Sequence, residues 1–230
     1  MWNKIQKIYI GDHYLVYPKW KPWSNTLVYY KFDWNLDDSS GNWYNLTNSW
    51  TISYSSSPSS IVLNSPAYLY TNISDSFNHN WTLNTYVKIT TRVIWLSCLM
   101  AKWQWSSRRM LICGLLQDGK LTFDFYGSWN KADWTIATSL NQWYNVCYTY
   151  NYTTRNYKAY LNWVKDIDAT LWWQYTISTQ QLNIWALANT TSDTNYRVIG
   201  NVDEYIIESK EWTAQEVADY YNSTKSCYWL

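Results

Sequence analysis

Hydrophobic and polar residues alternate in short runs along most of the chain. The clearest runs are residues 27–32, 81–89, 110–116, 120–126, 143–150, 157–161, 164–168 and 202–207. A period of two places one set of side chains on a buried face, and these runs are rich in residues that fit a pleated sheet. Asp118 and Gly119 join two of the runs as a tight hairpin, and polar clusters at 37–42, 55–60 and 189–195 are predicted loops. The pattern predicts many short strands.

One segment near the end of the chain has the signature of a helix. Thr213, Ala214, Gln215 and Glu216 form a capping-box sequence. Val217, Tyr220 and Tyr221 follow with the spacing of one helical face. Many strands with one terminal helix favour a β-sandwich or barrel over a mixed α/β fold.

The first residues differ from the rest of the chain. Residues 4–10 and 14–17 flank Gly11, Asp12 and His13, which predicts a small hairpin, and the segment 18–24 contains two prolines and predicts a stiff linker. We therefore predict two parts: residues 1–23 as an N-terminal hairpin with its linker, and residues 24–230 as one all-β domain.

Charge and composition exclude several classes of protein. The formal net charge is +1 and only 15% of the residues are charged, which argues against a nucleic-acid partner because such a protein needs a basic face. No run approaches the roughly 18 apolar residues of a membrane span, and no apolar leader precedes the hairpin, so we expect no membrane partner and no secretory signal. The four cysteines have neither zinc-site nor disulfide-framework spacing, and we interpret them as small hydrophobic residues.

Tryptophan and glycine occur in unusual numbers. The chain has 19 tryptophans and 6 glycines, although glycine ordinarily makes up about 7% of a chain. Several tryptophans lie in predicted turns, where glycine is the residue that accepts a positive φ. Trp163, for example, follows Asn162 between two strands, in a place typical of Asn-Gly. Trp34, Trp43 and Trp129 have similar settings, and we expect them in exposed turns, whereas Trp143 opens a strand and should be buried.

Three interpretations explain the tryptophans. In the first, a UGA codon that encodes glycine has been translated as tryptophan at positions such as 34, 43, 129, 163 and 185. In the second, exposed indoles form flat apolar platforms on which sugar rings stack. In the third, the tryptophans are ordinary core aromatics. Core burial explains neither the preference for turns nor the shortage of glycine, and we favour the first interpretation.

With glycine in those places, the chain resembles a known family over residues 24–224. The stretch 26–43 resembles the opening strand and turn of laminin-G-like, concanavalin A-like lectin and glucanase domains. The most specific match is the closing stretch 200–207 followed by 212–217, and the segments 160–164 and 182–186 resemble inner strands of the family. The resemblance implies an antiparallel two-sheet jelly roll, an all-β sandwich with a short C-terminal helix.

The resemblance also implies a cofactor, because concanavalin A-like sandwiches often hold a structural Ca²⁺ between their first and last strands. Asp33 and Asp203 occupy corresponding positions, with Asn35 or Asp38 nearby. The alternative is that Asp33 begins a turn through its own side chain and that Asp203 is a solvated strand residue.

For a carbohydrate ligand, the expected place is the concave sheet and the loops at its rim. Sugars are recognised by aromatic faces together with planar polar groups. This gives a set of candidate ligand-binding residues: Arg108, Arg109, Asp124, Tyr126 and Trp129. Alternatively, Arg108 and Arg109 form a solvated turn and Tyr126 belongs to the core.

The sequence does not predict an enzyme. Glycoside hydrolysis needs two carboxyl groups about 5 to 9 Å apart across the scissile bond. The only glutamates are Glu204, Glu208, Glu211 and Glu216, and none of them forms the spaced pattern of the hydrolytic family members. The two histidines are isolated in polar segments, without the partners of a catalytic triad.

These observations predict a non-catalytic carbohydrate-binding or adhesion module with a glycan partner. Because no export signal is found, the favoured place is a phage virion, on a tail or appendage, or an extracellular surface, with the N-terminal hairpin docking onto other virion or surface proteins. A structural decoration domain without a ligand and a glycoside hydrolase of the same fold are the alternatives.

Overall fold

A computed structural model describes most of the chain. The described residues are 6–10, 13–17, 24–48, 52–64, 68–73, 75–94, 96–104, 109–126, 135–172, 174, 181–185 and 196–230. Within the strands, the side chains of residues 6–10, 13–17, 103–104, 109–110, 112 and 125–126 lie outside the described part. Everything below refers to the described residues.

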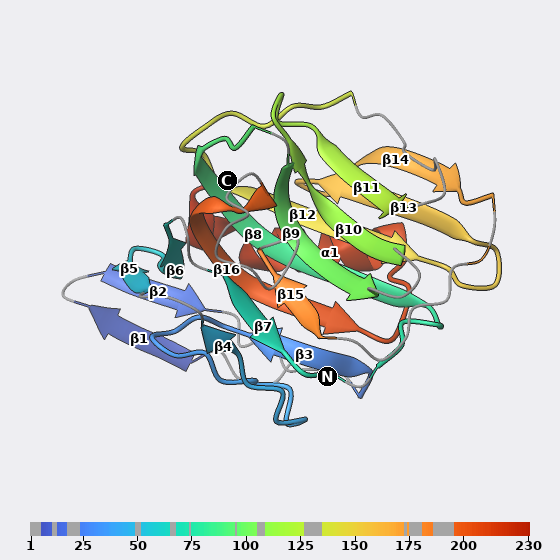
Figure 1. Ribbon diagram of the computed structural model, residues 1–230. Helices are drawn as coiled ribbons and strands as arrows, with labels where there is room; N and C mark the ends of the chain where they lie inside the picture. Colours follow the sequence, from blue (N-terminus) through green and yellow to red (C-terminus); the bar gives the residue numbers. More distant parts are fainter. Residues whose placement is uncertain are drawn as a thin grey trace.

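Two antiparallel sheets form a sandwich (Figure 1). The six-stranded sheet has the order β11-β10-β9-β15-β7-β4, with bounds Leu121–Tyr126, Arg109–Leu116, Leu96–Gln104, Leu182–Ile184, Leu69–Thr71 and Thr47–Asn48. The eight-stranded sheet has the order β14-β13-β12-β8-β16-β6-β5, and β3 also pairs with β16. Its strands are β14 Val164–Thr170, β13 Asn156–Leu161, β12 Tyr144–Tyr150, β8 Trp81–Thr91, β16 Ile199–Glu208, β6 Ser59–Leu63, β5 Ser53–Ser56 and β3 Thr26–Tyr30.

The main hydrophobic core fills the space between the two sheets. Alternate residues of facing strands point into it, including Leu111 and Phe123 of the six-stranded sheet and Val146 and Tyr148 of the eight-stranded sheet. This is the arrangement that a period of two in both sheets produces. The sandwich that the sequence predicts is therefore confirmed.

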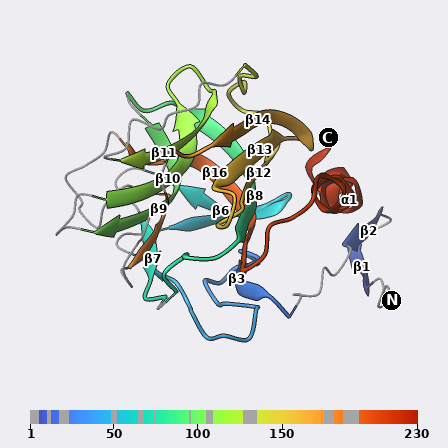
Figure 2. The same ribbon diagram turned by 90° about the vertical axis from the view of Figure 1, so that its right-hand side faces the viewer.

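Helix α1, Ala214–Thr224, covers the outer face of the eight-stranded sheet, and a 3₁₀ turn, Lys225–Tyr228, follows it (Figure 2). Thr213 and Glu216 form the predicted capping box, and Val217, Tyr220 and Tyr221 are the buried face of the helix, also as predicted. No helix in the described ranges has the length and apolar character needed to cross a membrane.

A second hydrophobic cluster lies under this helix. Trp212 is fully buried there, and its indole Nε1 donates to Glu208 at 2.8 Å while its backbone N–H donates to Thr82. Trp143, Tyr86 and Tyr228 pack in the same cluster, and the rings of Tyr86 and Tyr228 stack at 3.7 Å. A sheet with both faces covered explains why many residues of β8 and β16 are buried without alternation.

The predicted strands all exist, with ends shifted by one to three residues, but some predictions are wrong. The cluster at 55–60 is not a loop, because β5 and β6 form a hairpin there. Phe32 lies outside β3, since the strand ends at Tyr30 and Phe32 has a φ of 56°. The alternation also missed β9, whose sequence has no regular period because a bulge interrupts its pairing with β10.

The predicted N-terminal hairpin is present. Strand β1, Gln6–Ile10, pairs with β2, His13–Tyr17, as a separate two-stranded sheet. The boundary between residues 23 and 24 stays a prediction.

The three tryptophans predicted in exposed turns that the structure describes lie there. Trp34, Trp43 and Trp163 are 61%, 84% and 50% exposed, and each has a positive φ. Asn162 and Trp163 form the two-residue turn between β13 and β14, with φ values of 49° and 66°. Trp143 is 5% exposed, which confirms its predicted burial. Trp129 lies outside the described residues.

The close pairing of β16 with β8 depends on Gly200. Its φ is +152°, and a Cβ at this position would lie 2.1 Å from the backbone oxygen of Lys88. Only a hydrogen side chain fits between these strands. Gly41 also has a positive φ, of +94°, but nothing lies within 4 Å of the place where its Cβ would stand.

We therefore expect the substitution Gly200→Ala to destabilise the domain by at least ~2 kcal/mol, because it adds a backbone clash to backbone strain. Gly41→Ala is the matched control and should cost only about 1 kcal/mol, from strain alone. Urea unfolding of both variants measures the difference. Equal losses would contradict the packing argument.

Candidate functional site

The outer face of the six-stranded sheet carries a group of polar and aromatic side chains. Leu182 and Ile184 of β15 point into the core, so Asn183 points to the opposite face. By the same alternation, Thr122 and Asp124 of β11 flank the core residue Phe123 and point outward. Leu69 of β7 is a core residue, which places the side chains on either side of it, Tyr68 and Tyr70, on the outer face as well.

Strand register aligns these residues across the sheet. Asn183 pairs with Tyr70 of β7 on one side and with Ala101 of β9 on the other, and Tyr70 pairs in turn with Thr47 of β4. Ala101 continues through β10 to Asp124. Neighbouring strands lie about 4.8 Å apart, so the row from Thr47 to Asp124 extends over about 24 Å. We call this set, together with Tyr68 and Arg197, the outer-face row.

An arginine and two tyrosines form one end of the outer-face row. The rings of Tyr68 and Tyr70 lie 6.0 Å apart at 34°. Arg197 is fully buried, and its guanidinium lies 5.1 Å from the centre of the Tyr68 ring, which is the geometry of a cation–π contact. Aromatic faces and a planar charged group are thus combined at one place.

Two buried oxygen atoms of this face have no hydrogen-bond partner. Asn183 is 3% exposed, and its Oδ1 accepts no hydrogen bond. Thr122 is 2% exposed, and its Oγ1 is also unpaired. An unsatisfied buried polar group costs about 1–3 kcal/mol. Because the Asn183 oxygen is shielded from solvent, a ligand hydroxyl recovers that free energy only if neighbouring side chains move aside.

The predicted ligand-binding residues are described unequally. Asp124 is half-buried on β11, within the outer-face row. Arg108 and Trp129 lie outside the described residues, and so do the side chains of Arg109 and Tyr126. The sequence did not identify Asn183, Tyr68, Tyr70 or Arg197. The sequence pattern that could have identified Asn183 is a polar amide between two apolar residues, Leu182 and Ile184, in a short strand.

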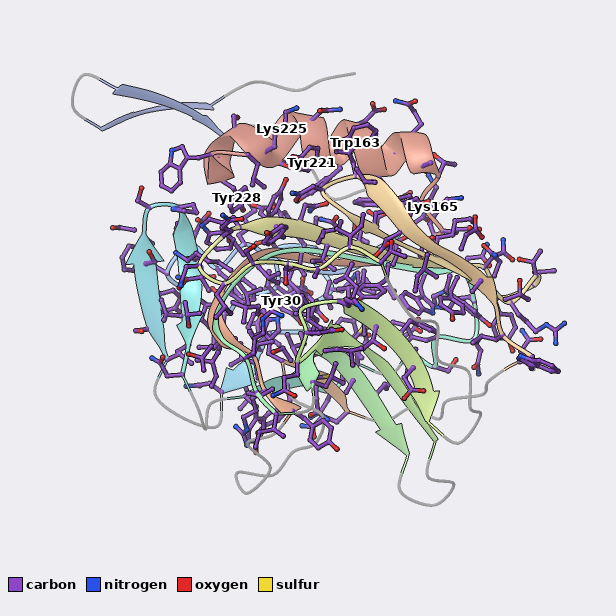
Figure 3. All side chains as sticks on the ribbon, turned by 90° about the horizontal axis from the view of Figure 1, so that it is seen from above. Tyr30, Trp163, Lys165, Tyr221, Lys225 and Tyr228 are labelled. Atoms are coloured by element: carbon purple, nitrogen blue, oxygen red, sulfur yellow. The ribbon has the colours of Figure 1, made fainter. Side chains whose placement is uncertain are left out.

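The predicted metal residues lie at a different place, on the helix side of the eight-stranded sheet. Asp203 is 6% exposed, so the alternative that it is a solvated strand residue is wrong. Its Oδ1 accepts from the backbone N–H of Glu204 at 2.9 Å, and its Oδ2 accepts from the hydroxyl of Tyr228 at 2.6 Å. Figure 3 shows Tyr228 on this side of the sheet, and Tyr30 between the two sheets.

Glu204 forms the second half of this acidic pair, at a bulge where the register of β16 against β8 shifts. Its φ is 49°, and its Oε2 accepts from the hydroxyls of Tyr29 at 2.5 Å and Tyr220 at 3.3 Å. Strand, helix and 3₁₀ turn therefore all meet at the pair Asp203–Glu204.

Burial and like charge shift the proton affinities of the acidic pair. Burial is the main cause that raises the pKa of Glu204 to about 7; the charge of Asp33 adds to it, and the Tyr29 hydroxyl opposes it. Burial, followed by the charge of Glu204, also holds the pKa of Asp203 well above its usual range. The charge of Asp33 adds to the raised pKa of both groups.

The described carboxylates do not fit a calcium ion as they are arranged. Ca²⁺ takes six to eight oxygen ligands. Within the described part of the chain, no group of three or more His, Cys, Asp or Glu side chains is placed to hold a metal ion. Both oxygens of Asp203 already accept hydrogen bonds, and the carboxylate of Asp38 is engaged by the Tyr29 N–H and the Tyr44 N–H. Calcium stays a prediction of the family resemblance.

A pocket of about 430 Å³ lies elsewhere on the molecule. It is lined by residues 141–144, by the turn residue Asn162 and by residues 228–230. Trp143 supplies a buried indole whose Nε1 is unpaired. This pocket is a second place where a small ligand could bind. Substitutions in it therefore serve as controls for the outer-face row.

The acidic pair predicts a stability that depends on pH. Because the pKa of Glu204 is raised in the folded state, its contribution is fully present below its usual pKa of 4.5 and is lost as the pH rises through about 7. We expect the melting temperature to fall between pH 5 and pH 8, and Glu204→Gln to reduce that fall. Glu211→Gln is the control, because Glu211 pairs with Lys158. A fall unchanged in Glu204→Gln would contradict the prediction.

A chelator tests the calcium prediction. Because both Asp203 oxygens are hydrogen-bonded, we expect excess EDTA to leave the melting temperature unchanged. A fall of several degrees in EDTA, reversed by added Ca²⁺, would instead mean that the Tyr228 hydroxyl yields its place to the ion.

Comparison with known proteins identifies the fold but no family. No family model matches the chain, and no curated protein matches it. Solved structures do resemble it. Domain 4 of AbnA, an extracellular arabinanase of family GH43 from Geobacillus stearothermophilus, solved with arabinotriose, has a TM-score of 0.67 and 18% identity over 85% of this chain and 97% of that domain.

Two further structures contain the same fold within longer chains. A structure from a study of botulinum neurotoxin type C and two ganglioside molecules has a TM-score of 0.67 and 15% identity, over 86% of this chain and 51% of its own. A sialidase of Trypanosoma rangeli, with 2,3-difluorosialic acid as a covalent intermediate, has a TM-score of 0.71 and 13% identity, over 90% and 34%. This chain thus spans about half and about a third of those proteins. At these identities the likeness establishes the β-sandwich fold.

Proposed function

We propose that the protein is a non-catalytic carbohydrate-binding module that holds a glycan on the outer-face row. The observation that carries the proposal is the buried, unpaired Oδ1 of Asn183 in register with Tyr70, beside the contact between Tyr68 and Arg197. A sugar offers hydroxyl donors for the amide oxygen and C–H faces for the tyrosines.

The length and composition of the row agree with an extended ligand. A row of about 24 Å suits several sugar units in succession. Asp124 at one end accepts hydrogen bonds from hydroxyls. Arg197 at the other end is fully buried and acts through its contact with the Tyr68 ring. The similar structures support the coarse assignment, since they include domains or proteins studied with arabinotriose, gangliosides and a sialic acid derivative.

We infer a binding rather than a hydrolytic role because of the carboxylates. Among the described outer-face residues, Asp124 supplies a carboxylate but has no second one in register with it, whereas hydrolysis needs a pair. Asp203 and Glu204 form a close pair, but tyrosine hydroxyls engage both carboxylates under helix α1.

A finer proposal concerns family and location. We propose that the sandwich is laminin-G-like, on the resemblance of 200–207 and 212–217, and that it belongs to a phage tail, an appendage or a cell-surface assembly. The β1–β2 hairpin, a separate two-stranded sheet, is the candidate docking element. Absence of the protein from purified particles in virion proteomics would remove the virion part of the proposal.

A glycan array followed by calorimetry with the strongest-binding oligosaccharide tests the site. We expect Asn183→Ala to weaken binding about tenfold or more, and Tyr70→Ala to weaken it as well, because each removes a contact worth about 1.4 kcal/mol or more. Gln142→Ala, in the pocket on the other sheet, should leave the affinity within about twofold. Circular dichroism must show that all three variants are folded.

Other outcomes separate the alternatives. Folded protein that binds no glycan would favour a decoration domain. A loss of binding in Gln142→Ala but not in Asn183→Ala would move the site to the pocket. Release of reducing sugar that disappears in Asp124→Asn would indicate a hydrolase.

A further inference from the structure

The backbone divides the described tryptophans into two groups. Trp34, Trp43, Trp163, Trp185 and Trp229 have φ values of 68°, 65°, 66°, 64° and 56°. They make up five of the eleven described non-glycine residues with a positive φ, although bulky side chains rarely adopt this region. The remaining residues in that set include two asparagines, which tolerate the region better. A random placement of tryptophan does not produce this concentration.

The second group consists of tryptophans with ordinary backbone and specific packing. Trp81 is fully buried and packs with Phe77 and Tyr150. Trp212 is buried and donates its indole N–H to Glu208, and Trp143 is buried against Tyr228. The indoles of these residues make packing contacts and, for Trp212, a hydrogen bond within the fold, as expected of encoded tryptophans.

The five tryptophans with a positive φ do not share a degree of burial. Trp43 is 84% exposed and Trp34 is 61% exposed, whereas Trp185 is fully buried. A sugar-stacking platform explains exposed indoles but not Trp185, and core packing explains Trp185 but not the exposed ones. The buried indole Nε1 of Trp185 has no partner, as is also true of Trp143, whereas that of Trp212 donates to Glu208. The feature common to all five is the backbone region that glycine alone adopts at little cost.

We propose that the chain made in its natural source carries glycine at positions 34, 43, 163, 185 and 229, encoded by UGA codons that are decoded there as glycine. Each position is then an ordinary glycine site. Asn162 with residue 163 becomes the Asn-Gly hairpin turn between β13 and β14, and residue 229 becomes the glycine that ends the 3₁₀ turn. The shortage of glycine in the chain is reduced by the same change.

The proposal is independent of glycan binding on the outer-face row, which contains none of these five residues. It does exclude the indoles of Trp34, Trp43 and Trp163 as sugar platforms in the natural protein.

The nucleotide sequence of the natural gene is the direct test. We expect UGA at codons 34, 43, 163, 185 and 229, and UGG at the control codons 81, 143 and 212. The intact mass of the protein from its natural source should be lower than the mass of the printed sequence by the difference between tryptophan and glycine at each changed position. UGG at any of codons 34, 43, 163, 185 or 229 would overturn the proposal.

A second test measures the strain itself in protein expressed with the printed sequence. Trp34→Gly, Trp43→Gly and Trp163→Gly should each raise the melting temperature by about 2–4 °C, because glycine removes the steric cost of the left-handed backbone. Alanine at the same positions is the matched control, since it removes the indole but keeps the Cβ, and it should give less than half of that rise.

Trp172 provides a control of another kind. It is 79% exposed but is not among the residues with a positive φ, so Trp172→Gly should lower the melting temperature or leave it unchanged. Equal effects of glycine and alanine at positions 34, 43 and 163 would contradict the claim that these positions require glycine.

Discussion

The structure depends on how closely other strands approach β16. This strand pairs with β8, β6 and β3, so it joins the two ends of the eight-stranded sheet. Near its start, Gly200 lets the backbone of β8 approach to a distance that no side chain permits. Three and four residues later, Asp203 and Glu204 form a bulge that turns two carboxylates toward the C-terminal helix. One strand therefore sets both the sheet pairing and the position of the helix.

Burying the acidic pair under the helix costs free energy, and hydrogen bonds from several tyrosine hydroxyls offset part of that cost. Burial is the main reason that each carboxylate favours its protonated form, and nearby negative charge, of Glu204 on Asp203 and of Asp33 on Glu204, adds to it. Tyr29, Tyr220 and Tyr228 donate hydrogen bonds to them and fasten the helix and the 3₁₀ turn to the sheet. The helix covers the outer face of the eight-stranded sheet, and the proposed glycan site therefore lies on the outer face of the other sheet.

The tryptophans with a positive φ and the outer-face row rest on different physical effects. At the tryptophan positions, steric exclusion by the Cβ determines which residue the backbone accepts, and it acts in the same way at each of them. In the outer-face row, the relevant effect is the missing hydrogen bond of a buried polar atom, the amide oxygen of Asn183.

The sequence alone determined the all-β class, most strands, the helix with its capping box and the turns around Trp34, Trp43 and Trp163. These features follow from local rules, because alternation, caps and turn geometry involve residues close together in the chain. It could not find β5 and β6, since a serine-rich hairpin looks like a loop until the sheet beside it is known. Asn183, Tyr70 and Asp124 are separated by up to 113 residues in the chain, and only the strand order brings them into one row. The assignment of Asp33 and Asp203 to a metal site stays a prediction, and the hydroxyl that donates to Asp203 comes from Tyr228, a contact that only the tertiary structure decided.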